Sequence, residues 1–426
     1  VGKRLELQAV RNEWEKDWSC RQSESGPLSL RNDATSESRS LDHSSLAEPK
    51  FPRQYGSGIH TRTLFLRRFG EVTRGHSDSE VKLRWLDDGQ ESLYTKVDKL
   101  TSVVASRNDL VEDYSHIRSL GEALSGSKVH TYGLANCKFN PVSLATFVKS
   151  VCWAEAAMTK VNVGMNPIGV DGAKALGAIL PGSSLKCLII GPKSTRLPVN
   201  DAEVTELNFE GQDFTPAEVT LVAAATSTMA TVEAIAIGGN PIGSEGGATL
   251  LETIKTSKLK TINIGKPLPL QEPYGSDTLD LSKTKMDPGH VLLLSWWLTT
   301  EFSAAVARLT LSGNRITNNG KDLTGLKALC EALLGLKNPI SLDLANCGFK
   351  VVEVNELAQA IQAGAAVARL ILNENPLTGG DYYYHDTDIT GITALFDALK
   401  TSSVTELGLA KCRLGPSSLG KLAEYV

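Results

Sequence analysis

One apolar phrase recurs along most of the chain and restricts its fold more than any other feature. It reads Val129-x-x-Tyr132-x-Leu134 at its first occurrence, followed by a small or polar turn residue, and it returns at spacings of 17 to 37 residues. Each copy buries only a few apolar side chains, so neighbouring copies must cover its open faces. The pattern therefore predicts a solenoid. The fourth positions of the phrase are Tyr132, Val161, Leu188, Leu207, Ile235, Ile262, Leu279, Leu309, Leu342, Leu370 and Leu407.

The regular copies combine a strand, an Asn-containing turn and a helix. The turn reads Asn-Pro-Ile-Gly at Asn166–Gly169 and at Asn240–Gly243, and helices are expected over Ala173–Leu180 and Ala248–Ile254. With a period of 27 to 29 residues, this unit resembles the ribonuclease-inhibitor type of leucine-rich repeat protein over residues 108–426. The resemblance implies an α/β horseshoe of about eleven repeats, with a parallel concave sheet and convex helices.

Two copies of the phrase depart from this unit. Gly191–Pro198 and Lys266–Pro273 are rich in proline and replace the expected helices. Because proline cannot continue a helix, both crossings are predicted to be extended. A thin strand in place of a wide helix should flatten the horseshoe at both points.

The first 105 residues lack the phrase and are predicted to form a separate domain. Strands are expected at Val1–Val10, Ile59–Phe69, Val81–Leu86 and Leu93–Val97, with a serine-rich insertion at about 19–58. This pattern favours a small β barrel. A capping helix is expected within residues 106–128, before the repeat domain at 129–426.

The segment from Val81 to Leu100 resembles SH3-like and Tudor-like barrels. In Tudor-type modules an aromatic cage holds a methylated Lys or Arg by cation–π attraction. The resemblance implies that Phe65, Trp85 and Tyr94 form such a cage. The alternative is that the three rings fill the core of the barrel.

Charge and cysteine content limit the classes of partner and the compartment. The formal net charge of -4 gives no basic field of the kind that nucleic-acid binding requires. The seven cysteines have no metal-ligand or redox spacing, and no N-glycosylation motif occurs, so an intracellular, reducing compartment is expected. That compartment is cytoplasmic or organellar, since a targeting segment cleaved before Val1 would leave no trace. The apolar run Val291–Leu298 is too short to span a membrane and predicts a buried helix.

A binding surface is expected at one edge of the solenoid rather than on its sheet. The central column of the strands contains no aromatic residue and no Arg, which are the usual anchors of tight protein interfaces. Insertions lengthen the same turn in two repeats, at Asn318–Asp322 and Leu377–Asp388. Loops on a rigid scaffold concentrate binding residues, and three consecutive tyrosines supply contact area. The candidate partner-binding residues are Asn318, Asn319, Lys321, Asp322, Asp381, Tyr382, Tyr383, Tyr384 and His385.

The sequence contains no recognisable catalytic motif, and neither a cofactor nor a metal is expected. A metal site at Asp381, His385, Asp386 and Asp388 fits no defined calcium loop. The favoured function is a non-enzymatic protein–protein interaction scaffold, or an accessory subunit of a larger intracellular assembly. One alternative is a leucine-rich repeat GTPase activator or other regulatory protein, using Arg315, Lys321 or Arg369. Another is a reader of modified peptides through the barrel.

Overall fold

The computed structural model divides the chain into two compact units, Val1–Tyr114 and Ser115–Val426. It describes residues 114–380 and 385–425, and before residue 114 only the backbone of five strands. The serine-rich segment at 19–58 and the strand expected at Val1–Val10 lie outside the described residues.

The five strands of the first unit form one antiparallel sheet in the order β4-β3-β2-β1-β5. Their bounds are β1 (Thr61–Phe65), β2 (Arg68–Ser77), β3 (Glu80–Trp85), β4 (Thr95–Lys96) and β5 (Leu100–Val103). The single strand predicted over Ile59–Phe69 is wrong, because Phe65 of β1 pairs with Arg68 of β2 as the two strands reverse. No Gly or Pro lies between these two residues, so the sequence carried no turn signal there.

The predicted closed barrel is not seen among the described strands. β4 and β5 are the two edges of the sheet, and no pairing joins them. Phe65 and Trp85 are the last residues of β1 and β3, and Tyr94 lies outside the described residues. The aromatic cage therefore stays a prediction.

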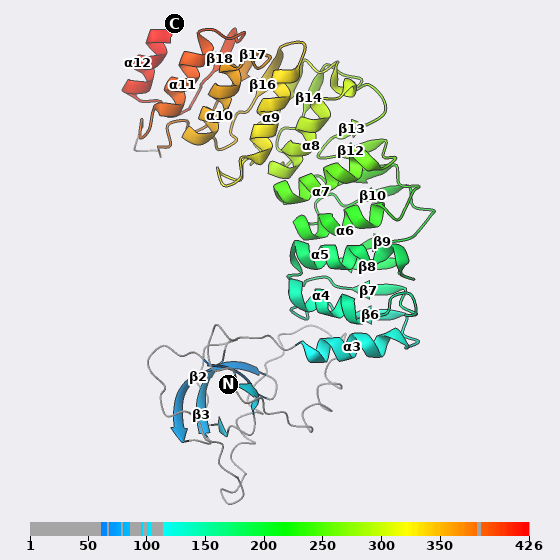
Figure 1. Ribbon diagram of the computed structural model, residues 1–426. Helices are drawn as coiled ribbons and strands as arrows, with labels where there is room; N and C mark the ends of the chain where they lie inside the picture. Colours follow the sequence, from blue (N-terminus) through cyan, green and yellow to red (C-terminus); the bar gives the residue numbers. More distant parts are fainter. Residues whose placement is uncertain are drawn as a thin grey trace, which may run out of the picture. The chain divides into compact units, whose positions relative to one another are not determined.

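The second unit is a mixed α/β stack of short strands and helices (Figure 1). Every fourth-position residue of the apolar phrase lies in one of its strands and is paired with the strands beside it. The strands are β6 (Thr131–Gly133), β7 (Lys160–Asn162), β8 (Cys187–Ile190), β9 (Thr195–Pro198), β10 (Glu206–Asn208), β11 (Ala234–Ala236), β12 (Thr261–Asn263), β13 (Pro267–Pro269), β14 (Thr278–Asp280), β15 (Arg308–Thr310), β16 (Ile340–Asp343), β17 (Val367–Ile371) and β18 (Glu406–Gly408).

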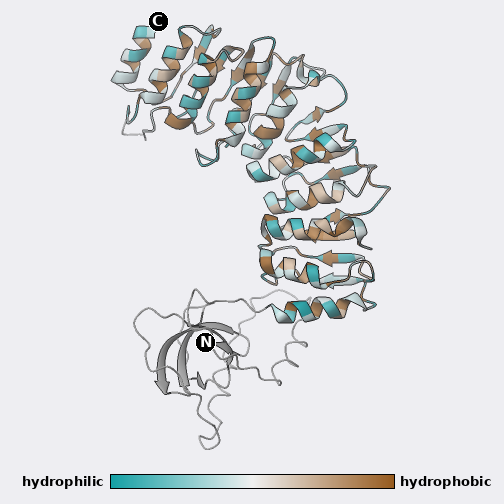
Figure 2. Ribbon diagram, viewed as in Figure 1, coloured by the Kyte–Doolittle hydropathy of each residue, from teal (hydrophilic) through white to brown (hydrophobic). Residues whose placement is uncertain are grey.

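Helices form the layer opposite the strands, and consecutive helices pack against one another. Apolar side chains such as Leu176, Leu250 and Trp297 are fully buried, while each helix also carries hydrophilic residues (Figure 2). The core therefore lies between the two layers. The helices are α3 (Ser115–Ser125), α4 (Pro141–Ser150), α5 (Gly169–Ala178), α6 (Pro216–Thr226), α7 (Gly243–Thr256), α8 (Pro288–Leu298), α9 (Thr324–Gly335), α10 (Val351–Gln362), α11 (Thr390–Leu399) and α12 (Pro416–Tyr425).

Four asparagines, of which Asn240, Asn314 and Asn375 are buried, join neighbouring repeats through their side chains. Asn240 is typical: its Nδ2 donates to Phe209 O (2.8 Å) in the preceding repeat and to Ile237 O (2.6 Å) in its own, while its Oδ1 accepts from Phe214 N (3.0 Å). A buried backbone group without a partner is costly, so these amides let the chain turn inside the stack. The other members of this asparagine ladder are Asn166, Asn314 and Asn375.

The two proline-rich crossings are extended, as predicted. β9 pairs antiparallel with β8, and β13 pairs antiparallel with β12. Each of these strands ends a sheet, so the strand layer consists of three separate sheets: β6 to β9, β10 to β13, and β14 to β18. The helix layer is not interrupted, because α5 packs directly on α6 and α7 directly on α8.

Candidate functional site

The first lengthened turn, Asn318–Asp322, leaves the stack between β15 and α9. Asn318, Asn319 and Gly320 have φ values of 49°, 59° and 81°, so three consecutive residues adopt the left-handed conformation. Asn and Gly tolerate this conformation better than other residues, which explains the composition of the turn. Asn318, Asn319 and Lys321 are exposed.

A buried carboxylate holds this turn from the next repeat. Glu353 on α10 is 1% exposed, and its Oε1 accepts a hydrogen bond from Thr317 Oγ1 (2.9 Å). Thr317 Oγ1 in turn accepts from Gly320 N (3.1 Å), and Glu353 Oε2 accepts from Lys350 N (3.0 Å). The turn is therefore fixed at its base, while Asn318, Asn319 and Lys321 remain exposed to solvent.

Asp322 closes the same turn at the start of α9. Its Oδ1 accepts a hydrogen bond from Thr324 N (3.0 Å). Partial burial tends to raise the pKa of Asp322, but hydrogen bonds from Thr324 and Ser244 outweigh it and lower the pKa below its usual value. The carboxylate of Asp322 therefore stabilises the start of α9, and Asp322 is also one of the predicted partner-binding residues.

The second lengthened turn, Leu377–Asp388, lies between β17 and α11. Its first residues are buried, including Leu377 and Thr378, and Asp388 N donates to Thr378 O (3.0 Å) where the chain returns. The hydroxyl of Thr378 is the one buried side-chain polar atom, among those described, that has no hydrogen-bond partner. Asp381, Tyr382, Tyr383 and Tyr384 lie outside the described residues.

Both ends of the segment 381–384 are anchored to the last repeat. On one side Arg413 Nη1 donates to Gly380 O (3.4 Å), and on the other His385 Nδ1 lies 3.2 Å from Arg413 O. Arg413 of the last repeat thus contacts the residues on both sides of this segment.

Asp386, next to His385, caps the N-terminus of α12 from another repeat. Its carboxylate accepts from Gly415 N (2.9 Å), Ser417 N (2.8 Å) and Ser418 N (3.0 Å), and from the hydroxyl of Ser418. Gly415 has no side chain to act as a cap, and a Cβ at this position would lie 2.7 Å from Asp386 Oδ2. No local sequence signal indicates this role of Asp386, because Asp386 and the start of α12 are far apart along the chain.

The bases of the two turns meet at the N-terminal end of α10. A Cβ at Gly348, just before α10, would lie 3.5 Å from Asn319 Oδ1, and a Cβ at Gly379 would lie 3.6 Å from Val351 Cγ2. The turn before α9 emerges from the same edge of the stack as the chain before α11 (Figure 1). The described parts of both turns thus lie beside the start of α10, and we name Asn318–Asp322 with Gly380 and His385 the α10 edge.

In the central column of the strands, by contrast, the Asn and Asp side chains form hydrogen bonds with the backbone. They accept a hydrogen bond from the N–H two residues later, as in Asn208 Oδ1 with Glu210 N (3.1 Å) and Asp343 Oδ1 with Ala345 N (2.9 Å). Such Asx turns direct the chain out of each strand. The column is therefore explained without a ligand.

The three basic residues proposed for a regulatory function do not form one cluster. Arg369 lies in β17 and pairs with Glu406 through Nε and Oε1 (2.9 Å). Arg315 and Lys321 lie in the turn after β15, and both are exposed.

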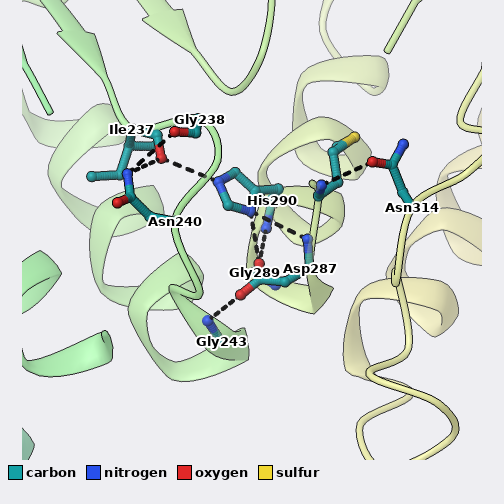
Figure 3. Close-up of polar contacts among 9 residues, drawn as sticks. Ile237, Gly238, Asn240, Gly243, Asp287, Gly289, His290 and Asn314 are labelled. Atoms are coloured by element: carbon teal, nitrogen blue, oxygen red, sulfur yellow. Dashed lines mark hydrogen bonds and ion pairs between the residues drawn. The ribbon is translucent and has the colours of Figure 1, made fainter. Parts of the chain in front are cut away.

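A buried histidine in α8 is a further polar group, and no sequence motif marks it. His290 is 0% exposed; its Nδ1 lies 2.7 Å from Asp287 Oδ1 and its Nε2 lies 3.3 Å from Ile237 O (Figure 3). Asp287 also accepts from Gly243 N (2.6 Å) through Oδ2. These contacts join α8 to the repeat of β11 across the intervening β12–β13 hairpin, so this pair fastens the helix layer where the strand layer is interrupted.

Comparison with known proteins identifies one segment of the stack. Residues 158–177, which contain β7 and most of α5, match the family model described as Leucine Rich repeat. No curated protein matches the chain. None of the helices that the structure describes is both long and apolar enough to cross a membrane. The segment 158–177 is therefore a leucine-rich repeat, a motif that generally serves protein–protein interaction.

Proposed function

We propose that the chain is a non-enzymatic interaction scaffold, or an accessory subunit of a larger intracellular assembly, that binds a protein partner through the α10 edge and the adjoining tyrosines. The proposal includes a repeat domain of the ribonuclease-inhibitor type, with about eleven repeats in a horseshoe. It also includes an SH3-like first unit.

The main support is the double anchorage of the segment 381–384 on Arg413. The scaffold holds Gly380 and His385 on one residue, and Asp386 is tied to α12 immediately afterwards. Fixed residues on both sides of Tyr382, Tyr383 and Tyr384 favour a contact there, and tyrosine supplies contact area at low entropic cost. The polar turn at Asn318–Asp322 would extend the same contact.

Co-purification of the tagged full chain from its native source, followed by binding assays with each purified partner, tests this function. Replacing Tyr382, Tyr383 and Tyr384 together by Ser should weaken binding of the partner by tenfold or more, since aromatic anchors dominate interface energies, with roughly 2 kcal/mol or more at each hot spot. Lys160→Ala, at an exposed position in β7 outside both lengthened turns, is the matched control.

Two outcomes would contradict the proposal. One is a chain that purifies alone under mild cross-linking. The other is a partner whose affinity is lowered by Lys160→Ala but not by the tyrosine substitutions. Stimulated GTP hydrolysis by a co-purified GTPase would instead support a regulatory enzyme activator.

A further inference from the structure

The two breaks in the strand layer have different chemistry, and the first leaves backbone groups unpaired. In the β8–β9 hairpin, Val199 N donates to Lys186 O (3.1 Å), which sets the alternation of the ladder. Residues 195 and 197 therefore face β8, whereas Arg196 and Pro198 direct their backbone groups away from it. The outer edge of β9 presents the N–H and C=O of Arg196 and the C=O of Pro198.

The edge of β10 that faces away from β11 is also open. Ala234 N donates to Thr205 O (3.2 Å) and Phe209 N donates to Ala236 O (2.8 Å), so alternate residues from 205 to 209 face β11. The backbone groups of Glu206 and Asn208 consequently point to the opposite side. Within the described residues, no ladder pairs β9 with β10.

We call the break between β9 and β10 the first seam and the break between β13 and β14 the second seam. A groove of about 310 Å³ lies along the first seam. Side chains join the two sheets beside it: Lys193 pairs with Asp213 (2.8 Å), and Thr195 Oγ1 donates to Gln212 Oε1 (2.7 Å). The groove itself is lined by residues of both strands, among them Arg196 and Pro198 of β9 and Glu206 and Asn208 of β10. The lining residues thus include the four positions with outward-facing backbone groups.

The second seam, between β13 and β14, has no such open edge on β13. Leu270 N donates to Lys260 O (2.8 Å), so Pro267 and Pro269 are the two residues of β13 that face outward, and neither has an N–H. The indole Nε1 of Trp297 donates to Pro269 O (2.7 Å), and Tyr274 packs edge-on against Trp297. At the corresponding position of α6 the chain has Ala225 in place of Trp297.

We propose that the first seam is a docking site for an extended polypeptide segment of a protein partner, which adds its backbone to the open edges of β9 and β10. Alternating N–H and C=O groups at strand spacing match another extended backbone. At the second seam Pro267 and Pro269 have no N–H to donate, and Trp297 already occupies the carbonyl of Pro269. The first seam retains the outward N–H groups of Arg196 and Glu206. This site is separate from the α10 edge and does not depend on it.

The proposal can be tested by proline substitutions at the first seam. These substitutions remove outward N–H groups, as Pro267 and Pro269 do at the second seam. The probe is a phage-displayed library of random peptides of about ten residues, selected against the full chain. Arg196→Pro and Glu206→Pro each remove one outward N–H without breaking a ladder bond inside the sheets, and each should weaken binding of the selected peptides by about tenfold. Arg196→Ala and Glu206→Ala remove the same side chain but keep the N–H, so each should bind the peptides more tightly than the proline variant at the same position. Melting temperatures of all four variants verify that they fold.

Backbone amide exchange supplies a second measurement on the unaltered chain. A bound peptide should slow the exchange of the Arg196 and Glu206 amides and leave the Leu268 amide unchanged, since Leu268 already faces β12. The proposal is overturned if the library yields no binder, or if alanine and proline variants lose affinity equally. It is also overturned if the chain forms a dimer that Arg196→Pro dissociates, because the occupant of the seam would then be a second copy.

Discussion

At the scale of single residues, polar side chains reach across repeats to satisfy the backbone of another element. Asp386 is the clearest case, because it caps α12 where Gly415 cannot. Burial tends to raise the pKa of Asp386, but the hydrogen bonds from Ser418, Gly415 and Ser417 outweigh it and lower the pKa below its usual value. The ionised carboxylate is therefore the form that stabilises the last repeat.

Replacing this cap should destabilise the last repeat in a pH-dependent way. We expect Asp386→Asn to lower the free energy of unfolding by about 1 kcal/mol at neutral pH, as for other N-cap losses. Because the folded pKa lies below the unfolded one, the contribution is fully present above the unfolded pKa and is lost as pH falls through the folded pKa. The variant and the parent should thus converge in acid. Urea unfolding at several pH values measures this, with Asp171→Asn in the first turn of α5 as a control that should change little.

Thiol reactivity gives a second prediction at this scale. Burial raises the pKa of Cys330 and Cys347 to about 12, whereas Cys152 is exposed. Since the thiolate is the reactive form, iodoacetamide should alkylate Cys152 in the native chain long before either buried thiol. Mass spectrometry of time points with and without denaturant measures the order. Equal rates in the native chain would show that the core around Cys330 and Cys347 opens easily.

At the scale of elements, the contact between α7 and α8 depends on two glycines that face each other. A Cβ at Gly289 would lie 2.1 Å from Gly243 O, and a Cβ at Gly247 would lie 2.6 Å from the Cα of Gly289. Backbones in such close contact let α8 pack on α7 although the β12–β13 hairpin separates them in the chain. The continuity of the helix layer across the second seam rests on this pair.

A methyl group at Gly289 should therefore force the two helices apart. We expect Gly289→Ala to cost about 3 kcal/mol of stability, the upper part of the usual range for overpacking, because the obstructing atoms belong to the backbone and cannot rotate away. Gly335→Ala near the end of α9 is the matched control, since nothing lies within 4 Å of a Cβ there. The control should be neutral or slightly stabilising. Thermal unfolding of both variants measures this. If the two substitutions lowered the midpoint equally, the backbone contact at Gly289 would not be the cause.

At the scale of the whole molecule, the chain is two compact units joined near Tyr114 and Ser115. Separate units with their own internal contacts are expected to unfold independently. Calorimetry of the full chain should show a transition that is also present in a fragment of residues 115–426, and Gly289→Ala should shift that transition alone. A single transition that the substitution shifts as a whole would indicate one cooperative body.

The sequence predicted the strands of the second unit well because each depends on a local apolar spacing. Tyr132, Leu309 and the other fourth-position residues all lie in strands. Helix starts were less accurate: α5 begins at Gly169, four residues before the expected Ala173, because Gly169 at φ 59° allows the helix to start directly after the turn. The cap at Asp386 and the open seam could not be predicted, since both depend on which distant backbones meet. The tyrosines of the predicted edge lie outside the described residues, so their role stays a prediction.

The prolines of β13 also matter while the chain is being synthesised. Once the segment up to Leu270 has folded and before β14 follows, the growing stack ends in β13. A bare strand edge at this stage would invite pairing with a neighbouring nascent chain. Pro267 and Pro269 offer no N–H to such a neighbour. The half-made stack is therefore protected against aggregation at the moment when its own next strand is not yet available.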